Sequence, residues 1–345
     1  MWAVVKEQAD VDFSLKDVPI PEPQADEVLI RVEAAGICGT DIPIFKGIRK
    51  VAYPLIPGHE FAGVIVEAGR QVKNFKVGDR VAPGLVVPCG QCDYCRRGLE
   101  SLCDHIYEIG IHVDGAFAEY VVAPEKTLHA LPAGLSFNQG AALDPIASAF
   151  RPVRKAQITS EDRVVIFGPG PIGLYALQLA RAEGARSVAV VGAAGDQHRL
   201  ELAKELGADI TIDGSERNPG AVVREFTGGR MADVVIEATG VPAVIEPGLA
   251  CLRKAGRLSL AGIFHDPASL AVGDLVRREI TITGSICYTW LDFQACLELV
   301  ASGRVRVEPL ITHEFPLSEM ERALAIAYRR ESIKIMLHPN RTNPG

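Results

Sequence analysis

The chain has 345 residues, of which 48% are hydrophobic and 23% charged, and its formal net charge is −7. This length supports two domains with a buried core each, and the composition excludes a disordered or fibrous protein. Because the net charge is negative and the basic residues are scattered, we expect no nucleic-acid partner. No segment reaches the roughly 18 consecutive apolar residues of a membrane span, and the first residues show no signal-like pattern, so we expect a cytoplasmic protein without a membrane partner.

The first 150 residues contain short Val- and Ile-rich runs that Gly and Pro interrupt, such as 27–33 and 61–67. Such runs predict a compact, mostly β domain. After Pro152, apolar strands alternate with amphipathic helices, which predicts a doubly wound, parallel, six-stranded Rossmann sheet. The expected strands are 163–167, 187–191, 210–212, 233–237, 257–261 and 280–284, with helices at 172–183, 197–206 and 246–252. Two helices at 291–302 and 318–329 and a last strand at 333–337 follow.

Four of the eight cysteines are crowded into one segment, with two, two and seven residues between successive members: Cys89, Cys92, Cys95 and Cys103. Four thiolates complete the tetrahedral coordination of Zn²⁺ and leave no open position. The spacing therefore predicts a structural zinc that holds its loop together. Disulfides are the alternative, but they are rare in a reducing cytoplasm.

Gly168, Gly170 and Gly173 form a G-x-G-x-x-G pattern that follows an apolar strand and begins a helix. In this setting the first glycine permits a tight turn, the second admits a pyrophosphate, and the third lets helix and strand approach closely. With Pro171 and Ile172 between them, these glycines are predicted to bind a dinucleotide at the helix N-terminus. A tight turn without a ligand is the alternative interpretation.

The position that binds the adenosine ribose lies at the end of the second Rossmann strand. Here that strand ends at Gly192, which offers no carboxylate to repel a 2′-phosphate, and Arg199 follows nearby. The pattern favours NADP or dual use, while binding of NAD through Asp196 or a backbone group is the alternative. Three more candidate cofactor-binding residues lie at the end of the fifth expected strand: Ala261, Gly262 and Ile263.

Cys38, His59 and Glu60 offer a thiolate, an imidazole and a carboxylate, all of which zinc accepts. Each is weak evidence alone, because an isolated Cys or His usually has only a packing role. Six motifs occur in order along the chain: GICGTD at 36–41, PGHEFAG at 57–63, VGDRV at 77–81, the four cysteines, DGAFAEY at 114–120 and the glycine turn.

This ordered set resembles the zinc-containing medium-chain dehydrogenase/reductase family over nearly the whole chain. The greatest similarity is to its sorbitol, threonine and galactitol-phosphate dehydrogenase branch, because Glu60 follows His59 and an acid–proline pair stands at Asp144 and Pro145. The resemblance implies an α/β protein with a GroES-like, β-rich catalytic domain at 1–150, a Rossmann domain at 151–284 and a C-terminal segment, 285–345, that returns to the catalytic domain. It also implies active-site residues where the domains meet, and a tetramer or dimer.

The resemblance further implies that Cys38, His59 and Glu60 surround a catalytic zinc, with Glu60 bound directly or through water. Asp144 takes the place of a second acidic ligand, and Thr40 that of the hydroxyl which binds the substrate oxygen. We therefore expect hydride transfer between NAD(P) and a secondary alcohol of polyol, sugar-alcohol or cyclitol type, with zinc as the Lewis acid. A dehydrogenase of simple secondary alcohols or ketones is one alternative, and a non-catalytic zinc-stabilised cofactor-binding protein is another.

Two positions depart from the relatives. Pro43 stands where many of them carry a proton-relaying His, and Cys287 stands where sorbitol and threonine dehydrogenases carry an Arg. Neither residue can replace the group it stands for, because proline has no proton to relay and a thiol cannot bind a polyol or carboxylate as a guanidinium does. We therefore expect an unusual sugar, a cyclitol or a simpler secondary alcohol as substrate.

Overall fold

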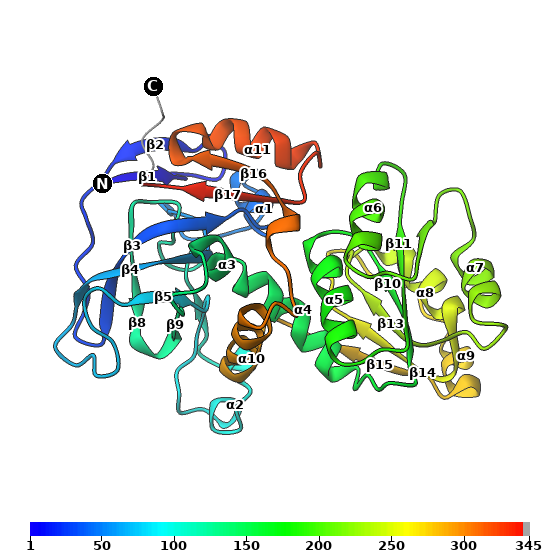
Figure 1. Ribbon diagram of the computed structural model, residues 1–345. Helices are drawn as coiled ribbons and strands as arrows, with labels where there is room; N and C mark the ends of the chain where they lie inside the picture. Colours follow the sequence, from blue (N-terminus) through cyan, green and yellow to red (C-terminus); the bar gives the residue numbers. More distant parts are fainter. Residues whose placement is uncertain (341–345) are drawn as a thin grey trace. The chain divides into compact units, whose positions relative to one another are not determined.

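A computed structural model describes residues 1–340 and divides the chain into two compact units (Figure 1). Among the described residues, no helix combines the length and the apolar character that crossing a membrane requires. The first unit consists of Met1–Asp144, Thr289–Ser302 and the chain from Val307 onward, and the second consists of Pro145–Tyr288 and Gly303–Arg306.

The first unit is built mainly of β-strands, as the sequence predicts. Its strands are β1 (Trp2–Val5), β2 (Ser14–Asp17), β3 (Glu27–Gly36), β4 (Glu60–Ala68), β5 (Arg80–Pro83), β6 (Val86–Val87), β7 (Tyr107–Glu108), β8 (Tyr120–Pro124), β9 (Leu128–Ala130), β16 (Ile311–Pro316) and β17 (Lys334–His338). Its helices are α1 (Asp41–Phe45), α2 (Asp93–Arg96), α3 (Phe137–Ala141), α10 (Trp290–Ala301) and α11 (Met320–Tyr328).

The main sheet of this unit joins the two ends of the described chain. Its strands run in the order β16-β17-β3-β4-β5-β9, and β8 pairs with β3. β17 is antiparallel to β3, with Met336 opposite Gly36, whereas it is parallel to β16. The buried face of the sheet carries apolar side chains that form one core with Phe45 and Phe117. Residues near the C-terminus therefore complete a domain that begins at the N-terminus.

The second unit is a parallel six-stranded sheet with helices on both faces. Its strands are β10 (Arg163–Phe167), β11 (Ser187–Gly192), β12 (Ile210–Asp213), β13 (Ala232–Glu237), β14 (Leu252–Leu260) and β15 (Thr281–Gly284). Its helices are α5 (Pro171–Ala182), α6 (Gln197–Glu205), α7 (Pro219–Phe226), α8 (Ile245–Cys251) and α9 (Val272–Arg278). Figure 1 shows α5 and α6 on one face, and α7, α8 and α9 on the other.

The strand order is β12-β11-β10-β13-β14-β15, and every neighbouring pair is parallel. This confirms the predicted doubly wound Rossmann sheet. The order reverses direction between β10 and β13, and in open α/β sheets the ligand binds outside the carboxyl ends of the strands at such a switch point.

Helix α4 (Leu143–Lys155) is not among the elements that the sequence predicts. It contains Pro145 and Pro152, and proline usually interrupts a helix. Pro145 lies in the first turn, where the backbone N–H that proline lacks would have no partner within the helix. Pro152 lies near the other end, and its carbonyl accepts a hydrogen bond from Ser259 Oγ at 2.9 Å. The change of sequence pattern near Pro152 therefore does not mark the end of helix α4, which continues to Lys155.

Candidate active site and metal centres

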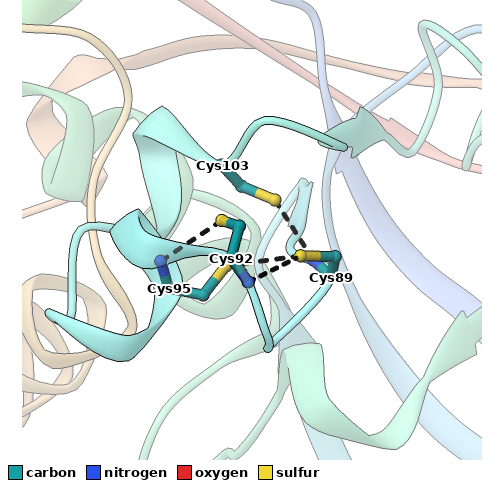
Figure 2. A group of neighbouring side chains, drawn as sticks. All are labelled: Cys89, Cys92, Cys95 and Cys103. Carbon is teal, nitrogen blue, oxygen red and sulfur yellow. Dashed lines mark hydrogen bonds between the residues drawn. The ribbon is translucent and has the colours of Figure 1, made fainter.

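The four clustered cysteines converge in the loop between β6 and β7 (Figure 2). Backbone N–H groups point at their sulfurs: Cys89 Sγ accepts from Cys92 N at 3.4 Å, and Cys103 Sγ accepts from Cys89 N at 3.2 Å. Cys92 caps helix α2, and its Sγ accepts from Cys95 N. Such N–H donors stabilise thiolates, which are the form that binds a metal.

Backbone donors and burial shift the pKa values of these thiols in opposite directions. Hydrogen bonds from the backbone of Gln91 and Cys92 lower the pKa of Cys89 to about 6. The pKa of Cys95 is raised to about 12, first by desolvation and then by the neighbouring thiols. Several thiolates this close repel one another unless a cation lies among them.

The spacing of the sulfurs fits zinc. All four Sγ atoms lie within 4.8 Å of one another, and Cys89 Sγ and Cys95 Sγ are 4.0 Å apart. Zn–S bonds of about 2.3 Å in a tetrahedron place the sulfurs about 3.8 Å apart. The donor set therefore matches a closed tetrahedral Zn²⁺ site.

A second group of ligand atoms comes from Cys38, His59 and Glu60, which lie within 4.8 Å of one another. The pairing of β3 with β4 brings them together, because Gly36 at the end of β3 is opposite Glu60 at the start of β4. Cys38 follows β3 by two residues, and His59 immediately precedes β4. One thiol, one imidazole and one carboxyl group are a ligand set that zinc accepts.

The carboxylate of Asp41 lies next to the imidazole of His59. This carboxylate is fully buried, its Oδ2 accepts a hydrogen bond from Cys38 N at 2.9 Å, and its Oδ1 lies 3.4 Å from His59 Nδ1. Burial alone lowers the pKa of His59, but the negative charges of Asp41 and Cys38 outweigh it, and the pKa is raised well above its usual value. The sequence reasoning did not assign Asp41 a role, although this residue ends the GICGTD motif.

Lys334 of β17 forms an ion pair with Glu60, and both side chains are at least 98% buried. Lys334 Nζ also donates to the carbonyl of Ile37 at 2.9 Å. Gly36 leaves room for this pair, because a Cβ there would lie 2.3 Å from Glu60 Oε2 and 2.8 Å from Lys334 Cε. Sequence reasoning missed Lys334; the only signal was a single lysine within an apolar strand.

Thr40 and Asp144, the other two residues expected at the catalytic site, differ in whether they lie beside these ligand atoms. Thr40 Oγ1 lies 3.6 Å from Cys38 Sγ, so its hydroxyl is next to the ligand atoms. Asp144 is buried in the first turn of α4, and its carboxylate is not among the three grouped ligands. The structure thus brings together three of the four expected catalytic ligands.

The glycine turn has the geometry that its expected role requires. Gly168 has φ of +98°, and a Cβ on Gly173 would lie 1.8 Å from Gly168 O. Gly170 is the N-cap of α5, with Pro171 at its first position, and a Cβ on Gly170 would meet nothing within 4 Å. The open space at Gly170 leaves the helix N-terminus accessible to an anion.

At the end of β11, the side chains beyond Gly192 are already engaged. Arg199 Nη1 lies 3.5 Å from Asp196 Oδ1, and both side chains are more than 90% buried. Asp196 Oδ2 also accepts a hydrogen bond from Ala193 N at 3.1 Å. The two residues that the sequence offered as alternative ribose or phosphate contacts therefore bind each other.

Two family models match separate parts of the chain. Residues 24–133 match the alcohol dehydrogenase GroES-like domain, and residues 171–302 match the zinc-binding dehydrogenase family. The chain is 38% identical to sorbitol dehydrogenase of Halalkalibacterium halodurans, over 98% of this chain and 99% of that one. The chain belongs to the zinc-containing medium-chain dehydrogenase/reductase family.

Other members of the family are similarly close to this dehydrogenase. D-arabitol-phosphate dehydrogenase of Enterococcus avium is 38% identical, over 94% of this chain and 93% of that one. A zinc-binding dehydrogenase of Sinorhizobium meliloti 1021, solved with NADP, is 32% identical with a TM-score of 0.91, covering 98% of this chain and 99% of that one. An alcohol dehydrogenase of E. coli CFT073, solved with NADH, is 31% identical with a TM-score of 0.92 and the same coverage. These relatives confirm the predicted family and branch.

Proposed function

We propose that this dehydrogenase transfers a hydride between NAD(P) and a secondary alcohol of polyol, sugar-alcohol or cyclitol type. The observation that carries the proposal is the group formed by Cys38, His59 and Glu60, with the Thr40 hydroxyl beside it. Relatives named for sorbitol and for D-arabitol phosphate support a polyol substrate. Pro43 replaces a His that is common in relatives, and Cys287 replaces an Arg that sorbitol and threonine dehydrogenases carry, which supports a substrate other than sorbitol or threonine.

Bound to Cys38 and His59, zinc supplies a Lewis acid that lowers the pKa of an alcohol and polarises the corresponding carbonyl. Asp41 Oδ1 lies 3.4 Å from Nδ1 of His59, so Nε2 would be the ring nitrogen available to the metal. Thr40 accepts a hydrogen bond from the substrate hydroxyl and passes its proton outward. Because Pro43 has no proton to relay, this path would continue through water and, with a cofactor bound, through its ribose hydroxyls.

Glu60 has a different role from Cys38 and His59 in this proposal. Its carboxylate is paired with Lys334, so we propose that it contacts the metal through water and balances charge from behind the site. Asp144 lies outside the group, and its side chain is one methylene shorter than the Glu usual in relatives, so we propose that it is not a direct ligand. Cys38 and His59 would then leave two coordination positions for water and substrate, and catalytic zinc sites generally keep at least one such open position.

For the cofactor we propose dual use of NADP and NAD. Gly192 places no carboxylate where it would repel a 2′-phosphate, which supports NADP. Arg199, however, already pairs with Asp196, whose negative charge weakens the attraction of Arg199 for a phosphate. A site without strong repulsion and without a free cation discriminates weakly between the two cofactors.

The test measures zinc per chain by mass spectrometry and reduction of NAD and NADP with polyols, polyol phosphates, cyclitols and simple secondary alcohols. We expect two zinc ions per chain and turnover with at least one polyol-type substrate. One zinc without turnover would instead support a non-catalytic, zinc-stabilised binding protein. Turnover restricted to simple alcohols would support the alternative substrate class.

The remaining expectations also stay proposals. We propose that the dehydrogenase works in the cytoplasm, where reducing conditions keep cysteine thiolates available to zinc. All eight cysteines are free of disulfides in the structure, which supports this location. We propose a homo-oligomer, tetramer or dimer, which light scattering on the purified protein measures directly.

A further inference from the structure

Glu237, the last residue of β13, is a carboxylate buried to 99%. Its Oε1 accepts hydrogen bonds from the Thr239 hydroxyl and from Thr239 N at 2.6 Å. Gly240 N lies 3.1 Å from Oε1 and 3.2 Å from Oε2. Every one of these donors is neutral, and all of them belong to the loop that follows β13.

This arrangement selects a carboxylate over an amide. An ionised carboxylate only accepts hydrogen bonds, so both of its oxygens can face N–H and O–H donors. A glutamine in the same place would have one accepting oxygen, and its NH₂ group would point at a donor. Because burying a charge is costly unless hydrogen bonds compensate for it, the loop must stay closely wrapped around Glu237.

The loop after β13 packs so closely against the loops after β10 and β14 that glycines in these loops have no space for a Cβ. A Cβ on Gly168 would lie 2.7 Å from Thr239 Cγ2. A Cβ on Gly240 would lie 2.4 Å from Ile263 O, and a Cβ on Gly262 would lie 2.1 Å from Gly240 N and 2.5 Å from Glu237 Oε2. The loop after β13 is therefore packed closely against the loops after β10 and β14.

Backbone hydrogen bonds reinforce this close packing. The carbonyl of Glu237 accepts from Ala261 N at 2.8 Å and from Gly262 N at 3.1 Å. Phe167, at the end of β10, accepts from Ala238 N at 2.9 Å. The backbone carbonyl of Glu237 thus holds the loop after β14, and its side chain holds the loop after β13, both at the carboxyl edge of the sheet.

This edge includes the β10–β13 switch point, where a dinucleotide binds. The glycine turn after β10 receives the pyrophosphate, and the adenosine half lies toward β11. The part of the sheet formed by β13, β14 and β15 then remains for the nicotinamide half of the cofactor. A change in the loops after β13 and β14 would therefore affect the nicotinamide half more than the adenosine half.

We propose that Glu237 is a positioning residue, which locks the loop 261–263 and the glycine turn into one arrangement and so prepares the site for the nicotinamide half of the cofactor. Thr239 transmits this effect through its hydroxyl, which binds Glu237, and its methyl group, which lies against Gly168. The inference rests on the proposed function, because it requires that the second unit binds NAD(P).

The test is calorimetric titration of the full-length, zinc-loaded protein with NADH, NADPH and 5′-AMP. We expect Glu237→Gln to weaken binding of the reduced cofactors about tenfold or more and to leave the affinity for 5′-AMP within twofold. Glu246→Gln removes an exposed carboxylate from α8 in the same unit, and this control should bind all three ligands like the wild type. Zinc content should be equal in all three proteins.

A second pair of variants separates positioning from folding. Thr239→Val removes the hydroxyl that binds Glu237 and keeps the branched shape, whereas Thr239→Ser keeps the hydroxyl. We expect weaker binding of NADH in Thr239→Val than in Thr239→Ser, and this comparison decides the matter if Glu237→Gln does not fold.

Three results would overturn the inference. One is wild-type affinity for NADH in Glu237→Gln, and another is an equal loss of NADH and 5′-AMP binding, which indicates a general structural role. The third is equal binding in the two Thr239 variants. A wild-type protein that binds neither NADH nor NADPH would refute the proposed function itself, and this result is distinct from the other three.

Discussion

At the scale of single residues, the candidate active site depends on charges that are buried in pairs. Glu60 and Lys334 are both nearly inaccessible to water, and Asp41 stands behind His59 in the same way. A buried ion pair adds little net stability compared with an apolar pair, but removing one partner leaves a charge without compensation. Substitutions here should therefore have large effects that a second substitution can reverse.

Lys334→Met should lower the free energy of unfolding by about 3–5 kcal/mol, because it leaves Glu60 buried without its cation. The double variant Lys334→Met with Glu60→Gln should recover more than half of the loss. Thermal unfolding measures both effects, with an expected drop of roughly 6–20 °C for the single variant. A single variant as stable as the wild type would show that the pair does not matter for folding.

Cys38→Ser should abolish turnover and leave cofactor binding unchanged, because Cys38 belongs to the first unit and the glycine turn to the second. The variant should also contain one zinc ion less per chain. Mass spectrometry of the metal and titration with NADH check these two effects separately. Normal turnover would contradict the assignment of Cys38 as a ligand of the catalytic zinc.

At the scale of secondary-structure elements, two parts of the first unit rely on unusual contacts. Helix α2 is only four residues long; Cys92 is its cap, Cys95 lies within it, and Cys89 and Cys103 lie close to both. Strand β9 contacts helix α10 through His129, whose ring stacks on Trp290 and Phe293 with centroid distances of 4.8 and 4.2 Å. Helix α2 and strand β9 are both too short to be stable by themselves.

Cys95→Ser should destabilise the loop 88–106, because three remaining thiolates no longer complete a tetrahedral site. We expect loss of one zinc ion, faster proteolysis within this loop, and turnover that persists in the folded fraction. Metal analysis and mass spectrometry of the proteolytic fragments measure these effects. Retention of both zinc ions would show that Cys95 is not a ligand.

Burial lowers the pKa of His129 to about 4, and a hydrogen bond from its ring to Gln294 only partly opposes this shift. Between that value and the usual pKa near 6.5, the unfolded chain binds a proton that the folded one does not, so stability decreases as pH falls. At pH 5 the loss amounts to about 2 kcal/mol.

His129→Gln removes this titration, so the variant should lose less stability than the wild type between pH 7.5 and pH 5. Thermal midpoints at the two pH values give the difference. An equal fall of the thermal midpoint in the variant and the wild type would mean that other groups cause the acid sensitivity.

At the scale of the whole molecule, the first unit needs the last strand of the described chain. β17 lies between β16 and β3, so its removal separates one strand from the sheet and also removes Lys334. The second unit contains no residue beyond Arg306. The two units should therefore respond differently to a shortened chain.

A chain that ends at Arg330 should fail to fold its first unit while the second still binds NADH. The only two tryptophans, Trp2 and Trp290, both belong to the first unit, so their fluorescence reports on that unit alone. We expect the emission of an unfolded protein together with retained cofactor binding. Native-like emission would show that β17 is dispensable.

Sequence patterns predicted the features that local spacing determines. The four-cysteine loop, the glycine turn and the alternation of the Rossmann unit all lie within short segments, and the structure shows each of them. Lys334 was missed because it acts on Glu60, which is 274 residues away in the chain. Glu237 was missed because a strand-ending acid resembles a surface residue until the burial around it is known. Helix α4 was missed because its prolines mask a helix that tertiary packing stabilises.

The pairing of β17 with β3 also affects how the protein matures during synthesis. The Cys89–Cys103 loop is complete within one short stretch, so it can capture zinc soon after it leaves the ribosome. Glu60, in contrast, waits for Lys334, and at about 5–20 residues per second the 274 residues between them take roughly 14–55 s to translate. The second unit, nearly continuous in sequence, is finished earlier. If Cys38, His59 and Glu60 hold a metal as proposed, we expect their site to be complete only after translation has passed β17.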